Sequence, residues 1–526
     1  MSALILAAWA ASMGLLVNRS YIQASAVNLA TDLARYGPTA QWRGVYYRGE
    51  KVGFTVSQTV RTEDGFELQE DGRLQMSLLG ATTAATIRTT ARVDASFALR
   101  SFDFSLDPGT GPIQVAGRVD GTRLHLTTIT GGQARAHVLE LDEPPALMLS
   151  LARRLAAAGL SPGASHQWTM FDPATLKNAP VRLDVGPREI VRVGGRPTPA
   201  FPVDLTFAGL TTRAWVTDTG EVVREESPLG LLTVAETPER AQQVAVPFAV
   251  QNDLLEASAV VPIAKERIGE PRDIRRLRLR VTGADLSGPD LVGAGQRIEG
   301  DLVEITDART FTPGPRPADL AAYLRPEPFI ESDAPEIQAE AARALAGITG
   351  TRARAEALTR YVNFLLEKKP TVSLPSALEV LRTKVGDCNE HTALYVALAR
   401  ASGIPARIAV GLVSVRNAFY YHAWPEVYID EGPEQGYWLP VDPTFNQFPA
   451  DATHLRLARG GLDRQAAILP LIGRIQMTVI DVELVPGADR VIVGRRAADL
   501  APLTVPLPRR TAGGCWTSSN QCRGCP

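Results

Sequence analysis

Cysteine is scarce in this chain of 526 residues, which contains four of them. Three of the four, Cys515, Cys522 and Cys525, lie together at the C-terminal end, so Cys388 is the one cysteine in the body of the protein. The terminal C-x-x-C pair lacks a fourth cysteine and a nearby histidine, which argues against a zinc site. We expect incidental thiols on a flexible tail, or a disulfide among them if the tail lies outside the cytoplasm.

A surplus of one charge is also lacking, because the formal net charge is −2. We therefore expect no nucleic-acid partner. Lysine is scarce, with 6 residues against 49 arginines, and together with the many alanines this indicates a GC-rich bacterial genome. The 45% of hydrophobic and 21% of charged residues are typical of a folded protein, and the length predicts two to four domains.

The chain has one long apolar run, MSALILAAWAASMGLLV at its N-terminus, whose length is at the short limit for a membrane-spanning helix. An A-S-A pattern at 24–26 also fits a signal-peptide cleavage site, and a buried helix is a third interpretation. No basic residue precedes the run, and Arg19 lies in the would-be cleavage region, which disfavours a secretory signal. Residues 1–20 are thus expected to be a single membrane anchor or signal-like segment.

The location that we expect is the bacterial inner membrane, with the domain at 326–485 in the periplasm. The positive-inside rule favours the opposite orientation, because it places Arg19 and Arg35, which follow the apolar run, in the cytoplasm. A misplaced start codon that removed basic residues upstream of the run would reconcile this rule with a periplasmic domain.

Residues 40–235 alternate apolar and polar positions, which predicts an antiparallel β-rich domain, either a strongly twisted sheet or an open barrel. Asp-Gly pairs at 64–65, 71–72 and 120–121 predict turns between its strands, and Asp-Thr-Gly at 218–220 predicts a hairpin. One stretch, 145–160, has a helical period. The scattered histidines of this domain, His125, His137 and His166, are interpreted as exposed or hydrogen-bonded residues without a catalytic role.

A second, smaller β-rich domain is predicted over 236–325, and the Pro-rich stretch 311–329 reads as a linker. The segment 326–485 then changes character. Four helical patterns, the last of them CNEHTALYVALARAS, precede three strand patterns, ARIAVGLVSV, YYHAWPEVYI and YWLPVDPTF, and one more strand, RIQMTVIDVEL, follows. Residues 486–526 are expected to be a flexible tail.

Cys388 lies where the fourth of these helices begins. Asp387 and Glu390 have the spacing of a capping box, with Asp387 as N-cap and Glu390 three residues later. The sulfur would then lie near free backbone N–H groups and the positive end of the helix dipole, a position that lowers the pKa of a thiol. A buried, inert cysteine is the commoner alternative.

Two residues downstream could complete a catalytic set with this thiol. His422 lies on a predicted strand, with Trp424 on the same face because side chains alternate. Asp442 lies in the next predicted strand, and neighbouring antiparallel strands can bring a histidine and an aspartate together. A cysteine, a histidine and an aspartate in this chain order could act as nucleophile, base and orienting acid. Asp442 precedes Pro443, however, and could also serve only to shape a turn.

Residues 375–445 resemble the transglutaminase-like superfamily. The resemblance rests on the GDC turn at 386–388, the stretch ALARASGIPARIAVG, the His422-Ala423-Trp424 strand and the motif WLPVDPT. It implies an α+β fold, a papain-like core of helices packed on a small antiparallel sheet, here preceded by the β-rich antiparallel domains. It also implies that Cys388 is the nucleophile, His422 the general base and acid, and Asp442 the residue that orients the histidine.

The activity that this resemblance implies is thiol-dependent acyl transfer on peptide or amide bonds, with a protein or peptide as substrate. The backbone N–H of Cys388 would be one donor to the oxyanion. By analogy we favour hydrolysis of the cysteine peptidase or amidase type over protein cross-linking. The other alternative is a non-catalytic scaffold or binding protein that uses the same fold.

A metal site is a further alternative, because Cys388, His391, His422 and Asp442 together could form a mixed tetrahedral set. A bound metal would occupy the thiol, however, and the matched motifs do not use His391. We therefore expect no metal and no cofactor. Asp387, Glu390, His391 and Trp424 are assigned supporting roles around the site.

Overall fold

The computed structural model describes residues 36–488 except for 79–80, 109–111, 208–209, 228–229, 244–258, 265–267, 284–285, 287–290, 370–374, 462–463, 465–467, 469–470 and 472–473. The expected anchor at 1–20 and the three C-terminal cysteines lie outside the described residues. Within those residues, none of the helices combines the length and the apolar character needed to cross a lipid bilayer.

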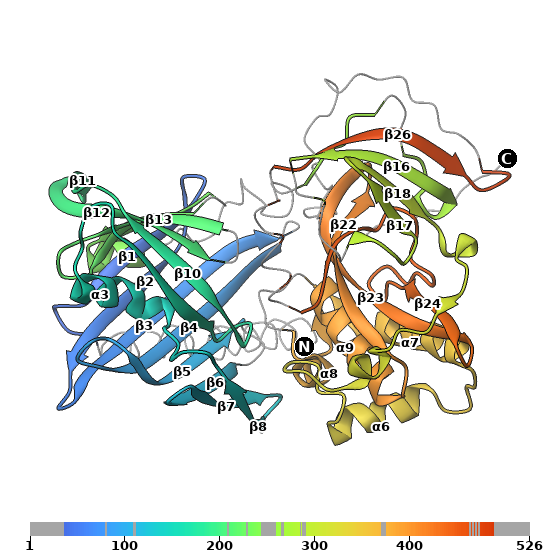
Figure 1. The fold of residues 1–526 in the computed structure, drawn as a ribbon, viewed down its shortest axis with the longest axis horizontal. Coiled ribbons are helices and arrows are strands. Elements are labelled where there is room, and N and C mark those ends of the chain that lie inside the picture. The colour runs from blue at the N-terminus through green and yellow to red at the C-terminus, as the bar shows by residue number, and fades with distance from the viewer. Residues whose placement is uncertain are drawn as a thin grey trace, which may run out of the picture.

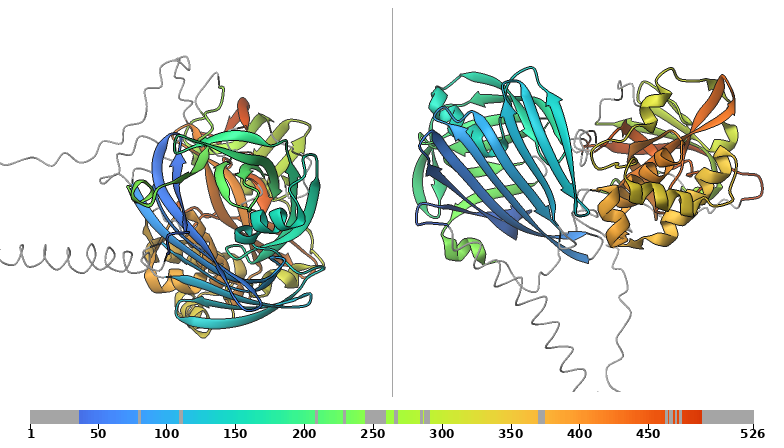
Figure 2. Two further views of the ribbon diagram at one scale, coloured as in Figure 1. Left: turned by 90° about the vertical axis from the view of Figure 1, so that its left-hand side faces the viewer. Right: turned by 90° about the horizontal axis from the view of Figure 1, so that it is seen from below.

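The N-terminal part is one large antiparallel sheet, strongly curved in Figure 2. Its strands follow the order β8-β7-β6-β5-β4-β3-β2-β1-β15-β14-β13-β12-β10-β9, with β11 paired to β12. Their bounds are β1 Gln41–Tyr47, β2 Glu50–Arg61, β3 Gly65–Leu78, β4 Ala81–Asp94, β5 Leu99–Asp107, β6 Ile113–Asp120, β7 Arg123–Thr130, β8 Gln133–Glu140, β9 Ser165–Asp172, β10 Lys177–Val185, β11 Glu189–Val193, β12 Arg196–Phe207, β13 Leu210–Val216, β14 Val222–Glu226 and β15 Leu231–Glu236.

The alternation in the sequence explains why these segments form strands with one buried face. In β7, Leu124 and Leu126 are buried while the residues between them are exposed, which is the period of two that a half-buried strand requires. The predicted turns at 64–65, 120–121 and 218–220 lie between consecutive strands, so these predictions are confirmed.

The predicted turn at Asp71-Gly72 is wrong, because both residues lie in the middle of β3. The Asp71 side chain is buried and accepts a hydrogen bond from Arg88 Nε at 3.1 Å on the neighbouring strand β4. A cross-strand ion pair thus stabilises an Asp-Gly pair in an extended strand, where the local sequence alone favours a turn.

One helix, α3 (Met148–Ala158), packs against β3, β4 and β9 and so links the middle of the large sheet to one of its end strands. Leu151 and Leu155 face the sheet and are buried. The helix lies within the predicted stretch 145–160. Of the three histidines of this part, His125 is exposed, His137 contacts Thr128, and His166 contacts a tryptophan ring with its Nε2 atom buried and unbonded.

A second, four-stranded sheet has the order β17-β18-β16-β26. Three of its strands come from the predicted smaller domain, namely β16 (Ile274–Thr282), β17 (Gln296–Glu299) and β18 (Leu302–Thr306). The fourth, β26 (Gln476–Leu484), comes from the end of the described chain, and it lies beside β16 in Figure 1. Leu277, Leu279 and Val281 of β16 are fully buried, as expected for a central strand with neighbours on both sides.

The third part holds four helices, α6 (Pro335–Ala344), α7 (Thr351–Leu365), α8 (Ala377–Thr383) and α9 (Cys388–Ala401). They precede four strands of a five-stranded sheet, whose edge strand β19 comes before the helices. The sheet has the order β19-β24-β23-β22-β25, with bounds β19 Gly314–Pro315, β22 Ala406–Val415, β23 Ala418–Gly432, β24 Gln435–Pro440 and β25 Leu455–Arg459. Helix α9 contacts β22, β23 and the other three helices, so the predicted arrangement of helices on a small antiparallel sheet is observed.

The remaining short elements connect these parts. They are α4 (Pro238–Gln242), η2 (Pro271–Asp273), η4 (Ala308–Thr310), η5 (Leu320–Leu324), β20 (Glu367–Lys368) and β21 (Val385–Gly386). The Pro-rich stretch 311–329 is anchored along the edge of the five-stranded sheet, because β19 pairs with β24 and Tyr323 packs edge-to-face on Trp438.

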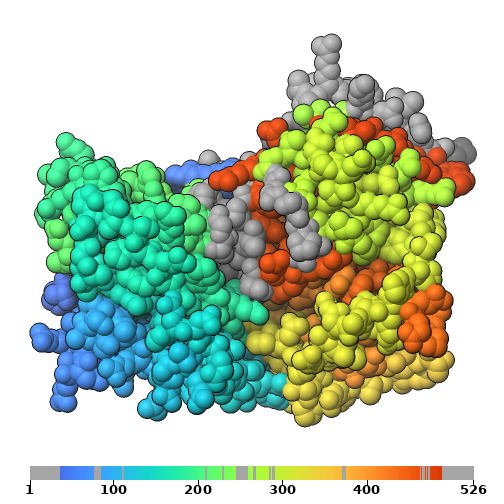
Figure 3. Space-filling model, in the orientation of Figure 1, coloured from blue at the N-terminus to red at the C-terminus, as the bar shows by residue number. Residues whose placement is uncertain are grey.

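The large sheet and the helical part are in contact, and their atoms meet along one seam in Figure 3. At this seam the β7–β8 hairpin reaches the segment between η5 and α8. Thr130 donates a hydrogen bond to the buried carboxylate of Glu331 at 2.9 Å, and Arg135 pairs with Asp333 at 2.7 Å. Phe329 is buried in the core of the large sheet, which joins the two parts further.

Candidate active site

Cys388 is the first residue of α9, and a complete capping box holds this end of the helix. Asp387 Oδ1 accepts from the backbone N–H of Asn389 at 3.0 Å, and Glu390 Oε2 accepts from the backbone N–H of Asp387 at 2.8 Å. Position 386 requires glycine because an added Cβ would lie 2.2 Å from Cβ of Glu390. The predicted capping box is therefore confirmed, and it fixes the turn that presents the thiol.

Helix α9 is docked on β23 beside His422. Thr392, one turn after Cys388, donates from Oγ1 to the carbonyl oxygen of Ala423 at 3.0 Å. Residues four apart lie on one face of a helix, so Cys388 faces the same strand, where its thiol interacts with the backbone of Ala423. The thiol of Cys388 thus lies against Ala423, the residue that follows His422 on β23. No hydrogen bond joins Cys388 and His422 among the described residues.

His422 and Asp442 form a buried pair, with His422 Nε2 2.8 Å from Asp442 Oδ2. Asp442 was expected on a strand, but it lies two residues beyond the end of β24. Its other oxygen, Oδ1, accepts from the backbone N–H groups of Thr444 and Phe445 at 2.7 and 3.0 Å. Asp442 therefore shapes the turn and also holds the histidine, so both interpretations from the sequence apply.

The geometry selects the tautomer of His422. Because the Asp442 carboxylate accepts from Nε2, a neutral His422 carries its hydrogen on Nε2 and its lone pair on Nδ1. Phe445 stacks on the imidazole ring with centroids 4.9 Å apart, and Trp424 stacks at 6.1 Å from the same strand. The predicted placement of Trp424 beside His422 is thus observed, and the imidazole ring packs against two aromatic side chains.

The turn after Asp442 is held from the helical side as well. Asn363 of α7 donates to the carbonyl oxygens of Pro443 and Thr444 at 2.7 and 3.1 Å. Burial opposes ionisation of Asp442, but its interactions with His422 and His454 outweigh burial and hold its pKa well below the usual range. The carboxylate is therefore anionic and accepts every hydrogen bond described.

The environment of the thiol differs from the expectation. Burial raises the pKa of Cys388 well above its ordinary value, and the negative charges of Asp387, Glu390 and Asp442 raise it further, while the backbone of Ala423 acts in the opposite direction. The sequence predicted a lowered pKa from the helix N-terminus. That prediction is wrong mainly because the sulfur is desolvated, and further because the residues that cap the helix are themselves carboxylates near it.

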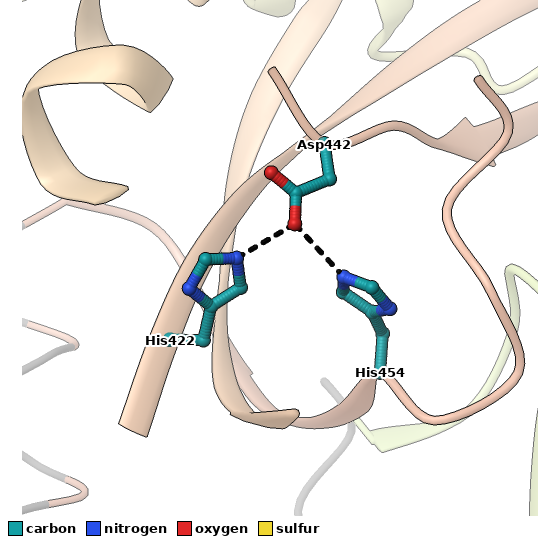
Figure 4. Close-up of side chains that lie close together, drawn as sticks. All are labelled: His422, Asp442 and His454. Carbon is teal, nitrogen blue, oxygen red and sulfur yellow. Dashed lines mark hydrogen bonds and ion pairs between the residues drawn. The ribbon is translucent and has the colours of Figure 1, made fainter. Parts of the chain in front are cut away.

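The sequence analysis missed His454, which lies in the loop before β25. Its Nε2 is 3.2 Å from the same Asp442 oxygen that binds His422, as Figure 4 shows. Its Nδ1 faces the carbonyl oxygen and Oδ1 of Asp451 at 3.1 and 3.3 Å. Burial lowers the pKa of His454, but the two aspartates outweigh it and raise that pKa to about 10. A histidine outside every strand pattern gave no sequence signal.

The metal set suggested by the sequence does not assemble. Among the described residues, the group of potential ligands that lie close together is His422, Asp442 and His454, without Cys388 or His391. Their spacing is that of hydrogen bonds, which already account for both contacts to Asp442. His391 contacts the carbonyl oxygen of Asp387 through Nδ1 at 2.7 Å, and its buried Nε2 has no partner.

A buried ion network lies further along β23. Glu426 is fully buried and binds Arg456 of β25 at 2.6 Å, Arg407 of β22 at 2.7 Å and Arg459 at 3.3 Å. Burial opposes its ionisation, but the three guanidinium groups lower the pKa of Glu426 to about 2. The network therefore holds β22, β23 and β25 together in the middle of the strand that carries His422.

Comparison with known families agrees with this geometry, because the model of the transglutaminase-like superfamily matches residues 339–443. This region is a transglutaminase-like domain. The match spans α6 to the turn at Asp442 and includes Cys388 and His422. No curated protein matches the chain.

Several solved structures are similar at low identity. A candidate cysteine protease from Cytophaga hutchinsonii shares 16% identity with a TM-score of 0.27, covering 42% of this chain and 91% of its own. A DUF1089 family protein from Pseudomonas aeruginosa shares 16% identity with a TM-score of 0.22, covering 32% and 87%. A candidate protease from Parabacteroides distasonis shares 12% identity with a TM-score of 0.19, covering 66% and 69%.

Proposed function

We propose that the transglutaminase-like domain hydrolyses peptide or amide bonds by thiol-dependent acyl transfer. Cys388 acts as the nucleophile, His422 as general base and then general acid, and Asp442 as the residue that orients the imidazole. The observation that carries this proposal is the buried pair of His422 and Asp442, whose side chains are 2.8 Å apart. His422 lies on β23, and the N-terminus of α9 presents the thiol to this same strand.

The first half of the reaction forms a thioester. As the Cys388 sulfur attacks the carbonyl carbon, the thiol proton moves to Nδ1 of His422, and the carbonyl oxygen takes up the negative charge. The backbone N–H of Cys388 donates to this oxyanion. The bond to the amine then breaks, His422 gives its proton to the departing nitrogen, and an acyl-enzyme remains on Cys388.

The second half of the reaction releases the acyl group. Water attacks the thioester and gives a proton to Nδ1 of His422. Collapse of the second tetrahedral intermediate breaks the carbon–sulfur bond, releases the carboxylic acid, and returns the proton from His422 to the Cys388 sulfur. An acceptor amine in place of water would give transamidation, so the identity of the acceptor separates hydrolysis from cross-linking.

The raised pKa of Cys388 affects how this thiol is activated. A thiol with such a pKa is protonated at neutral pH, so proton transfer to His422 accompanies the attack rather than preceding it. This resembles a serine nucleophile, which also depends on an adjacent base. Reactivity should then depend on His422 and Asp442 as strongly as on the sulfur itself.

An electrophilic thiol probe tests the proposal. We expect chloroacetamide to alkylate Cys388 in the full-length protein, read from the Cys388 peptide by mass spectrometry. Asp442→Asn should slow the labelling by about two to four orders of magnitude, because it favours the wrong histidine tautomer. Asp430→Asn, an exposed acid later on β23, is the matched control and should leave the rate unchanged.

A peptide library then tests the chemistry. Cleavage that is abolished in Cys388→Ala supports hydrolysis, and product formation only in the presence of an added amine supports cross-linking. A labelling rate that is the same in the native protein, Asp442→Asn and a free cysteine peptide would contradict the proposal.

A non-catalytic binding role is the second candidate. It is favoured by the raised pKa of the partly buried thiol and by the absence of a hydrogen bond between the described residues Cys388 and His422. Under this alternative, Cys388→Ala would retain the biological activity of the native protein, which the hydrolase proposal does not allow.

A further inference from the structure

Asp442 binds two histidines through one oxygen. Its Oδ2 atom is 2.8 Å from His422 Nε2 and 3.2 Å from His454 Nε2, and all three side chains are at least 95% buried. Figure 4 shows the two rings approaching this oxygen from different sides. The proposed function uses His422 and leaves the second histidine without a role.

The hydrogen bonds of His454 require a charged ring. Nε2 faces the Asp442 carboxylate, and Nδ1 faces the carbonyl oxygen and the carboxylate of Asp451. These groups accept hydrogen bonds, while a neutral imidazole has only one N–H to donate. Both nitrogens are therefore protonated, and the raised pKa of His454 agrees with this assignment.

The second carboxylate is itself held in place. Gln447 donates to Asp451 Oδ2 at 2.7 Å, and Thr453 donates to Oδ1 through its backbone N–H and its hydroxyl at 2.9 and 2.6 Å. Asp451 is thus fixed toward His454, and its pKa is lowered to about 2 despite burial, mainly by the charge on His454. The loop 447–454 is built around this buried ion pair.

We propose that His454 is a positioning residue for the catalytic pair, a buried imidazolium that locks Asp442 and keeps His422 in its neutral, base-competent form. This inference rests on the proposed function. The positive charge of His454 offsets part of the negative charge of Asp442, so an uncharged residue at position 454 should change the pH at which the catalytic pair takes up a proton.

The other groups around His422 do not supply this charge. Cys388 approaches from α9, and the acids of that helix end, Asp387 and Glu390, carry negative charge. Trp424 and Phe445 stack on the ring and are uncharged. Of the described groups in contact with the pair, His454 is the cation.

The pH profile of Cys388 alkylation tests this role. We expect His454→Gln, which can still donate to Asp442 but carries no charge, to move the lower inflection of the profile to higher pH by about one unit. Below both inflections, this corresponds to about tenfold slower labelling. His137→Gln, at a half-buried histidine of β8, is the matched control and should not move the inflection.

The charge of His454 can be measured by NMR, independently of the reactivity of Cys388. With the six histidines isotopically labelled, NMR should show one imidazolium that persists at pH 8 and is absent in His454→Gln. Asp451→Asn keeps an acceptor for Nδ1 but removes the charge, and it should bring the titration of this histidine to lower pH. This variant remains informative if His454→Gln folds poorly.

Three results would overturn the inference: a neutral His454 at pH 7, an unmoved inflection in a folded His454→Gln protein, or stoichiometric zinc held by His422, Asp442 and His454. A persistent imidazolium in a protein whose Cys388 resists labelling at every pH would instead refute the proposed function and the catalytic role of His454 but not its charge.

Discussion

At Cys388 the local helix geometry and the surrounding charges act in opposite directions. The N-terminus of α9 favours a thiolate, whereas burial and three carboxylates disfavour it. The same two residues that complete the capping box, Asp387 and Glu390, account for part of this opposition. The stability of the helix end is therefore coupled to a less acidic thiol.

Replacing the N-cap separates these two effects. Asp387→Asn keeps a side chain that caps equally well but removes a negative charge beside the sulfur, so the pKa of Cys388 should fall and its alkylation at pH 7 should become several-fold faster. The melting temperature should stay nearly constant. Asp319→Asn, at the exposed N-cap of η5, serves as the control, and a slower reaction in Asp387→Asn would contradict the electrostatic account.

The raised pKa of His454 also predicts how the stability of the fold depends on alkaline pH. Its pKa is raised from 6.5 to about 10, so the folded state binds one more proton than the unfolded state between these values. The stabilisation is complete below pH 6.5 and is lost as pH rises to about 10, with a slope of up to about 1.4 kcal/mol per pH unit. Denaturant titrations at several pH values should show this slope, and His454→Gln should flatten it.

The sequence predicted part of this site for clear physical reasons. The capping box and the strand position of His422 follow from short-range patterns, and both are observed. The raised pKa of the thiol and the contacts of His454 depend on burial and on a loop that folds back to Asp442. Such contacts between segments without periodic structure leave no local pattern in a single sequence.

Among the elements, β23 combines the site with its support. His422 lies near the middle of this strand, and Glu426, four residues later, binds three arginines. Because side chains alternate along a strand, both residues lie on one face. A change at Glu426 should therefore affect the stability of the sheet that positions His422.

Glu426→Gln should lower the free energy of unfolding by about 3–5 kcal/mol, because it leaves buried guanidinium groups without their anion. The pKa of Glu426 is lowered from 4.5 to about 2, so its contribution is present above pH 4.5 and is lost as pH falls through 2. Native protein should thus lose stability in this range more steeply than the variant. Glu434→Gln, at an exposed acid of the β23–β24 turn, should change neither quantity.

At the level of elements, alternation and helical periods located most strands of the large sheet and the four helices α6 to α9. The errors have long-range causes. Asp71-Gly72 is extended because Arg88 on the next strand binds Asp71. The partner of β26 could not be found from the sequence either, because strand pairing across some 200 residues depends on the packing of the whole molecule.

In the molecule as a whole, the buried carboxylate of Glu331 joins the large sheet to the helical part. It accepts from Thr130 of β7 at 2.9 Å and from Ser376, the N-cap of α8, at 2.7 Å. The β7–β8 hairpin is thereby fastened close to the helices that surround the thiol. Thermal unfolding of the two parts should be coupled through this contact.

Glu331→Gln should weaken that coupling, since an amide cannot accept from both hydroxyl groups as well as a carboxylate does, at a cost of about 1–3 kcal/mol. We expect calorimetry of the variant to resolve two transitions that overlap more closely in the native protein. Glu336→Gln, an exposed acid of the same seam, is the control. Identical calorimetric traces for native protein and Glu331→Gln would show that the hairpin contact does not couple the parts.

The pairing of β26 with β16 has a consequence for any attempt to move this transglutaminase-like domain into another protein. The segment with Cys388, His422 and His454 begins after three strands of the four-stranded sheet, β16 to β18, and ends before the fourth, β26. It is therefore inserted within a second folding unit. A transplant of 326–485 would carry β26 without its partner and expose an unpaired strand edge that favours aggregation, so a portable unit has to include β16 to β18 as well.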